Sequence, residues 1–246
     1  MTDRRYGCRR DLPDHRDAPY RLSRSPYAAA PPPRADLALI GPVVWDQGSL
    51  GSCAAHAGLG MLCYETRNFA LPSRLQLYYY SRLRAGPENA GADTGCCLRD
   101  VLKVLREMGA ADERAWPYRD ADPGPYQRRP GQDIVAQGLS RRLKSYHAVP
   151  SLDVARLEIA SGHPVVCGLQ VPSGWAGGDL LLVPSPDSRV EGGHAVLAVG
   201  YDDAKAALKI RNSWGPGAGV DGYFWMSYSF WQDLAWTFDA WAGRAA

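Results

Sequence analysis

The sequence predicts an α+β protein in two lobes, with helices in its first half and strands in its second. Apolar residues recur at helical spacing over 53–69, 73–84 and 97–108. Later apolar segments are short and bounded by turn residues, over 164–171, 192–201 and 208–212. Helices followed by strands, rather than an alternation of the two, are typical of the α+β class. A cleft between two such lobes is a natural position for a binding site.

The composition is that of an ordinary globular protein, since 46% of the 246 residues are hydrophobic and 22% are charged. The formal net charge of +2 gives no general attraction to nucleic acid or to an anionic membrane. The sequence lacks a run of about 18 apolar residues, so we expect no transmembrane helix. Its amino terminus lacks the apolar core of a secretory signal. We therefore expect a cytoplasmic monomer, with export by a signal-free route left open, and no nucleic-acid or membrane partner.

The cysteines are expected to be free thiols, because no secretory signal is visible. There are six of them: Cys8, Cys53, Cys63, Cys96, Cys97 and Cys167. The adjacent pair at 96 and 97 does not readily form a disulfide, since the small ring would strain the peptide bond. The sequence has no second cysteine pair and no histidine pair at zinc-finger spacing. We predict neither a metal nor a cofactor.

A tight Gly/Ser turn leads into Cys53, which begins an apolar segment at helical spacing. The unpaired N–H groups at a helix start favour a thiolate over a thiol, and the thiolate is the nucleophilic form. Gln47 lies six residues upstream, across the turn, where its amide can donate to an oxyanion. For a cysteine considered alone, a buried structural thiol is the plainer interpretation.

Two later segments supply a candidate base and a residue that orients it. His194 begins one predicted strand, and Asn212 ends the next one, after a polar turn. Pairing these strands in an antiparallel manner brings His194 near Asn212. A cysteine, a histidine and an asparagine then form a nucleophilic triad. His56, one helical turn after Cys53, is a weaker candidate because its spacing places it beside the helix.

These segments resemble the motifs of the papain-like cysteine peptidases. The stretch 47–53 is similar to their glutamine–nucleophile motif, 194–196 to their histidine strand and 212–215 to their asparagine motif. The three occur in the order of the family, and the resemblance covers roughly residues 31–246. It implies a two-lobed fold, with a helical lobe and an antiparallel barrel-like β lobe around the cleft. It also implies roles: nucleophile for Cys53, general acid and base for His194, orienting residue for Asn212, oxyanion donor for Gln47 and a shield against water for Trp214.

The resemblance further indicates a branch of the family and a substrate-binding surface. Ala54 and Leu50 replace a tryptophan and a disulfide cysteine that many members carry, as in bacterial and intracellular branches. The loop at Gly95 and Cys96 takes the place of the wall that pairs with substrate backbone. The remaining expected substrate-binding residues are Gly168, Gly193 and Ala195. The small residues at 168 and 195 predict a roomy apolar pocket, although strand packing alone would also require small side chains.

We divide the chain into an extension over residues 1–30 and a peptidase domain over 31–246. The helical lobe is expected mainly over 50–130, and the β lobe over 35–46 and 140–246. The extension is rich in arginine and proline and has no apolar periodicity. One interpretation is a short pro-segment that lies across the cleft with residues 6–20 and keeps the enzyme latent. The other is a strap on the surface.

The function that follows is a cysteine-type peptidase that hydrolyses bonds of a peptide or protein substrate. A catalytically silent papain-like binding module is one alternative, and the intact triad argues against it. A transamidase or deamidase that uses the same triad is a second alternative. Incubation with an amine acceptor, followed by mass analysis, distinguishes transfer from hydrolysis.

Overall fold

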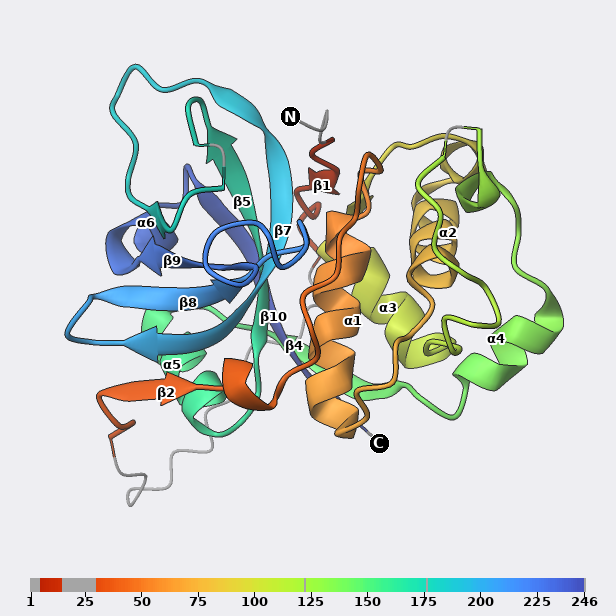
Figure 1. The fold of residues 1–246 in the computed structure, drawn as a ribbon, viewed down its shortest axis with the longest axis horizontal. Helices are drawn as coiled ribbons and strands as arrows, with labels where there is room; N and C mark the ends of the chain where they lie inside the picture. The colour runs from red at the N-terminus through yellow and green to blue at the C-terminus, as the bar shows by residue number, and fades with distance from the viewer. Residues whose placement is uncertain (1–4, 15–29, 122, 176, 246) are drawn as a thin grey trace.

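The computed structural model describes residues 5–14, 30–121, 123–175 and 177–245, and it has helices on one side and a large sheet on the other (Figure 1). The helical side contains four α-helices: α1 (Cys53–Thr66), α2 (Arg74–Ala85), α3 (Leu98–Glu107) and α4 (Gln132–Gly138). Three short 3-10 helices lie at Ala38–Ile40, Pro87–Gly91 and Pro125–Gln127. The predicted α+β class is confirmed.

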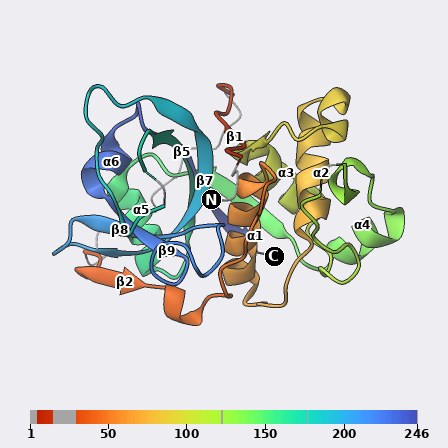
Figure 2. The ribbon, with the colours of Figure 1, turned by 45° about the horizontal axis from the view of Figure 1, so that its top comes forward.

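The other side is built on an eight-stranded sheet. Its strands are β2 (Arg34–Asp36), β4 (Leu143–Ala148), β5 (Val165–Pro172), β6 (Leu180–Leu181), β7 (Val190–Asp202), β8 (Ala207–Arg211), β9 (Tyr223–Ser227) and β10 (Thr237–Ala245). They pair in the order β4-β10-β5-β7-β8-β9-β6, with β2 added beside β7. Helices α5 (Leu152–Ala160) and α6 (Tyr228–Gln232) pack on this side, as Figure 2 also shows. Strands β7 and β8 are antiparallel neighbours, as the sequence predicted.

Helix α1 lies between the sheet and the other helices, and it is buried almost all round rather than on one face. Its small residues permit this close packing. A Cβ at Gly58 would meet the Val101 side chain of α3 at 2.4 Å, and one at Gly60 would meet Leu197 of β7 at 3.0 Å. Helical spacing of apolar residues indicates only one buried face. The second face of α1 gives no such signal, because glycine and alanine contribute little to hydrophobic periodicity.

Local signals set the ends of several elements. Ser73 caps α2 by accepting from the backbone N–H of Gln76, and Ser151 caps α5 by accepting from that of Val154. Helix α4 was not predicted, because it is only seven residues long and its larger apolar residues, Ile134 and Val135, are too few to show a helical period. In the stretch 35–46, which we assigned to the β lobe, the named elements are the end of β2 and the 3-10 helix Ala38–Ile40. In the described part of the chain, no helix is both long and apolar enough to cross a membrane.

Residues 5–14, which we call the strap, run between the two sides of the molecule (Figures 1 and 2). Within the strap, β1 (Cys8–Arg9) pairs in parallel with β3 (Cys96–Cys97). The strap also contacts β7. Residues 1–4 and 15–29 of the expected extension lie outside the described residues.

Candidate active site

Cys53 is the first residue of α1, and the preceding turn fixes where that helix begins. Gly48 adopts a left-handed φ of 57°, and its N–H donates to the side chain of Asp46 at 2.8 Å. The N–H of Gly51 donates to the carboxylate of Asp93 at 3.0 Å. The turn therefore delivers the Cys53 thiol to the helix N-terminus, between the two sides of the molecule.

Burial governs the ionisation of Cys53, whose side chain is fully buried. Desolvation raises the pKa of this thiol above its ordinary value. Backbone N–H groups of Ala195, Gly7, Ala54 and Cys53 itself lower the pKa and offset only part of that effect. The sequence predicted a depressed pKa from the helix N-terminus. That expectation is wrong for the covered form of the site, because the desolvation of the fully buried sulfur outweighs the effect of the N–H groups.

His194 and Asn212 meet across the paired strands β7 and β8. The Nε2 atom of His194 lies 2.8 Å from Oδ1 of Asn212, and both side chains are buried. Oδ1 of Asn212 also accepts the N–H of Ser213 at 2.8 Å, so it acts as an acceptor and assigns the proton to Nε2. Nδ1 is then the ring nitrogen that can take up a proton.

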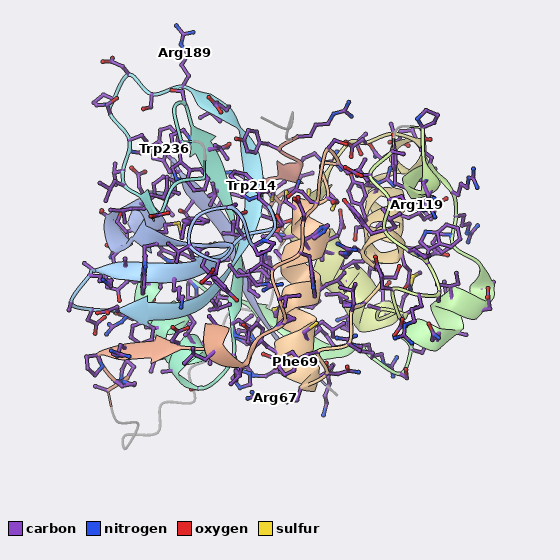
Figure 3. The ribbon with its side chains drawn as sticks, in the orientation of Figure 1. Arg67, Phe69, Arg119, Arg189, Trp214 and Trp236 are labelled. Atoms are coloured by element: carbon purple, nitrogen blue, oxygen red, sulfur yellow. The ribbon has the colours of Figure 1, made fainter. Side chains whose placement is uncertain are left out.

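Trp214 lies over the His194 ring, with ring centroids 4.9 Å apart and an interplanar angle of 32°. Figure 3 labels Trp214 at the centre of the molecule, between the sheet and α1. The indole is 5% exposed and also contacts Trp175, at 5.6 Å between ring centroids. This packing keeps water away from the His194–Asn212 hydrogen bond.

Gln47 is fully buried and its amide is held at both ends. Its Oε1 accepts from the Ser213 hydroxyl at 2.6 Å, and its Nε2 donates to the Leu50 carbonyl at 2.8 Å. Nε2 also donates to the backbone carbonyl of Arg5 at 3.3 Å. A carbonyl of the strap thus accepts a hydrogen bond from the amide that we expected to donate to the oxyanion.

The strap packs directly against the residues of the site. Tyr6 lies against His194 and Trp214, with ring centroids 6.1 and 6.2 Å apart. The next residue, Gly7, directs its N–H to the Cys53 sulfur. A Cβ on Gly7 would meet the Gly51 carbonyl oxygen at 1.9 Å, so no larger residue fits there without a shift.

Three of the five predicted substrate-binding residues contact the strap. The N–H of Cys96 donates to the Gly7 carbonyl at 2.9 Å. A Cβ on Gly95 would meet that same carbonyl oxygen at 2.0 Å, and one on Gly193 would meet the Cys8 carbonyl oxygen at 2.1 Å. The walls expected to bind substrate backbone are therefore occupied by backbone of the chain itself.

The other two predicted substrate-binding residues, Ala195 and Gly168, lie next to the Cys53 sulfur and next to Phe238, respectively. Ala195 directs its N–H to the Cys53 sulfur. A Cβ on Gly168 would meet the Phe238 ring at 2.2 Å. The ring fills the space beside Gly168, one of the two positions where small residues predicted a roomy apolar pocket. Phe238 enters from β10, and no motif marks its position in the sequence.

His56 is unsuited to act as the base. It is buried against Trp45 and Tyr118, and its Nδ1 lies 3.0 Å from the Ser52 carbonyl oxygen. Desolvation, followed by the charge of Arg74, lowers its pKa to about 3, so it stays neutral at ordinary pH. Among the described residues, no group of three or more His, Cys, Asp or Glu could hold a metal ion.

Asp93 is a site residue that sequence reasoning missed. Its buried carboxylate accepts from Gly51 at 3.0 Å and from the Tyr78 hydroxyl, and it forms an ion pair with Arg5 of the strap at 3.1 Å. It therefore joins the nucleophile turn to the strap. An aspartate in a Gly-rich loop carries no distinguishing signal in the sequence.

Comparison with known proteins assigns the family. The sequence model of the papain family of cysteine proteases matches residues 34–233. A peptidase C1-like protein of Acanthamoeba polyphaga mimivirus is 30% identical over 216 residues, which cover 80% of this chain and 68% of that one. A cathepsin B-like protein of Giardia intestinalis is 30% identical over 74% of this chain and 63% of its own. The chain belongs to the papain family of cysteine proteases.

Solved structures agree with this assignment. The crystal structure of xylellain, a cysteine protease from Xylella fastidiosa, matches with a TM-score of 0.91 and 34% identity, over 100% of this chain and 97% of that one. Procathepsin L 3 of Tenebrio molitor matches with a TM-score of 0.70 and 22% identity, over 99% of this chain and 76% of that one, and it supports the fold. The predicted papain-like fold and the predicted similarity to bacterial members are both confirmed.

Proposed function

We propose that this papain-family peptidase hydrolyses peptide bonds with Cys53, His194, Asn212 and Gln47, and that the strap holds it latent. The arrangement at the sulfur supports latency most directly. Cys53 faces the N–H of Gly7, whereas attack requires a carbonyl carbon at that place. The amide of Gln47 already donates to the Arg5 carbonyl. Nucleophile and oxyanion donor are both occupied, in an arrangement that cannot lead to cleavage of the strap.

In the open enzyme, His194 removes the thiol proton and the Cys53 thiolate attacks the substrate carbonyl carbon. The oxyanion is stabilised by the Gln47 amide and by the N–H of Cys53 at the start of α1. His194 returns the proton to the leaving amine, and the resulting acyl-enzyme is released by water that His194 activates. Asn212 orients the imidazole through these steps, and Trp214 keeps water from their hydrogen bond.

Labelling of Cys53 by an epoxysuccinyl peptide inhibitor tests this proposal, with intact mass as the readout. We compare the full chain, a chain that begins at Pro31 and a Cys53→Ala control, after melting curves show that each is folded. Labelling that is fast only in the shortened chain is the expected result. Equal labelling of both chains would contradict latency, and no labelling of either would favour a silent binding module.

A further inference from the structure

Three buried thiols meet where the strap crosses the cleft. Cys8 of the strap, Cys53 and Cys96 of β3 are 6%, 0% and 0% exposed. All three are free thiols. A negative charge on Cys53 opposes ionisation of both other thiols, which places the three sulfurs within electrostatic reach of one another. The proposed chemistry uses only Cys53, so the other two have no assigned role.

Cys8 and Cys96 are direct neighbours on paired strands. They are Cα partners in the parallel pairing of β1 with β3, and the hydrogen bond from Cys96 N–H to the Gly7 carbonyl holds that register at 2.9 Å. Paired strands lie about 4.8 Å apart, which is within the range of about 4.4–6.8 Å that Cα atoms of a disulfide span. Opposite residues of a parallel pair also point to the same face of the strands.

Cys97 supplies an internal comparison. It is the next residue of β3 and therefore points to the opposite face, where it pairs in register with Arg9 rather than with a cysteine. Its sulfur lies 3.6 Å from the Arg10 carbonyl oxygen. Two adjacent cysteines thus differ in one respect that matters here, which is that only Cys96 has a thiol partner on the strap.

We propose that Cys8 and Cys96 form a reversible disulfide that fastens the strap across the cleft under oxidising conditions. This inference rests on the latency proposed above. The oxidant is a hydroperoxide: two S–H bonds break and one S–S bond forms. The two electrons and two protons reduce the peroxide O–O bond, which yields two molecules of water from hydrogen peroxide. A dithiol reverses the step by thiol–disulfide exchange.

The burial of both thiols determines when the bond can form. Desolvation raises the pKa of Cys8 and of Cys96 well above the ordinary value, so neither is a thiolate while the strap is fully docked. The thiols therefore react when the strap loosens and water reaches them. Once formed, the disulfide keeps the strap from leaving and changes a transient cover into a covalent one. Thiol reduction then becomes a requirement for opening the site.

Peptide mapping tests the bond itself. The full chain is treated with hydrogen peroxide, alkylated and digested with trypsin without reduction. We expect the peptide Tyr6–Arg9 to be joined to Ala85–Arg99 with the loss of two hydrogens. The same link should form in Cys97→Ser and be absent in Cys96→Ser and in Cys8→Ser. Absence of a link in the unmodified chain, or a link from Cys8 to Cys53 or to Cys97, would overturn the proposal.

The labelling rate of Cys53 tests the consequence. After peroxide is removed, we expect labelling of the full chain and of Cys97→Ser to fall at least about tenfold and to recover with dithiothreitol. Cys8→Ser measures the fall that comes from direct oxidation of Cys53, so an equal fall in Cys8→Ser contradicts the lock. The two proposals fail separately. A missing link with slow labelling of the reduced full chain rejects only the disulfide, whereas equal labelling of reduced full and shortened chains rejects latency.

Discussion

The imidazole of His194 and the amide of Asn212 are joined by a 2.8 Å hydrogen bond that is buried beneath the indole of Trp214. The bond holds the ring with Nε2 toward the amide oxygen. Nδ1 is therefore the nitrogen that is left to accept or donate a proton. Two strands that pair in register bring these residues together although 18 positions separate them in the sequence.

Replacement of Asn212 by alanine is expected to lower kcat by roughly 10- to 100-fold, because a hydrogen bond to a charged group contributes about 1.5–3 kcal/mol. KM should change little, since Asn212 acts on the orientation of the base. Steady-state peptide hydrolysis by the chain that begins at Pro31 measures the effect. Asn68→Ala, at an exposed position just after the end of α1, is the matched control and should leave kcat unchanged. A full kcat in Asn212→Ala would remove its orienting role.

Cys53→Ala should abolish peptide hydrolysis in the same shortened chain, because no other thiol is at the helix start next to His194. Cys167→Ala is the control. That thiol is buried in β5, in a different part of the hydrophobic core from Cys53, and it has no part in the proposed mechanism. Turnover measured on highly purified protein decides the matter. Hydrolysis that persists in Cys53→Ala would reject the nucleophile.

Gln47→Ala should lower kcat by about 10²- to 10³-fold, the usual cost of losing one oxyanion donor. The amide also bonds to Ser213 and Leu50, so the variant is compared with the unmodified chain by melting temperature before kinetics are measured. A folded Gln47→Ala with unchanged kcat would exclude the amide from oxyanion stabilisation.

The order of the motifs in the sequence was enough to predict the fold, and the positions of the four proposed catalytic residues follow from local rules. Cys53 follows a turn that requires glycine, and the β7–β8 pairing follows from two apolar segments around a polar turn. These signals are local, so a sequence exposes them directly.

The strap and the pocket depend on contacts between segments that are distant in the sequence. Nothing near Gly7 indicates that it fits between Gly51 and Gly95, and Phe238 reaches Gly168 from the other end of the chain. The N–H that Gly7 directs to the Cys53 sulfur has the same origin, because Gly7 lies more than forty positions upstream. Such effects require the tertiary structure.

The carboxyl group of Asp11 is expected to make strap docking depend on pH. It is buried beside Asp239, and it accepts from the Arg99 N–H and the Trp241 indole N–H, both at 3.1 Å. Desolvation, followed by the charge of Asp239, raises its pKa from 3.8 to about 7 in the docked form. Docking therefore takes up a proton between these values. The stabilisation is fully present below pH 3.8 and is lost progressively as pH rises to about 7.

The expected result is that strap release increases by up to about tenfold per pH unit between about 4 and 7, and levels off above 7. The ratio of Cys53 labelling rates between the full chain and the chain that begins at Pro31 measures it, because ionisation of Cys53 in the open site affects both rates. Asp11→Asn removes the titrating group and should flatten the ratio. A ratio that does not vary between pH 4 and 7 in the unmodified chain would rule out Asp11 as a pH-sensitive contact.

Latency through the strap is tested most directly by Gly7→Leu in the otherwise unmodified full chain. The added side chain begins 1.9 Å from the Gly51 carbonyl oxygen, so the strap has to shift away from Cys53. Leu12→Ala is the control, because Leu12 belongs to the strap and its side chain is 79% exposed. We predict that Cys53 of Gly7→Leu is labelled by the epoxysuccinyl inhibitor at least about tenfold faster than in Leu12→Ala and the unmodified chain. Equal rates in all three folded chains would contradict the account.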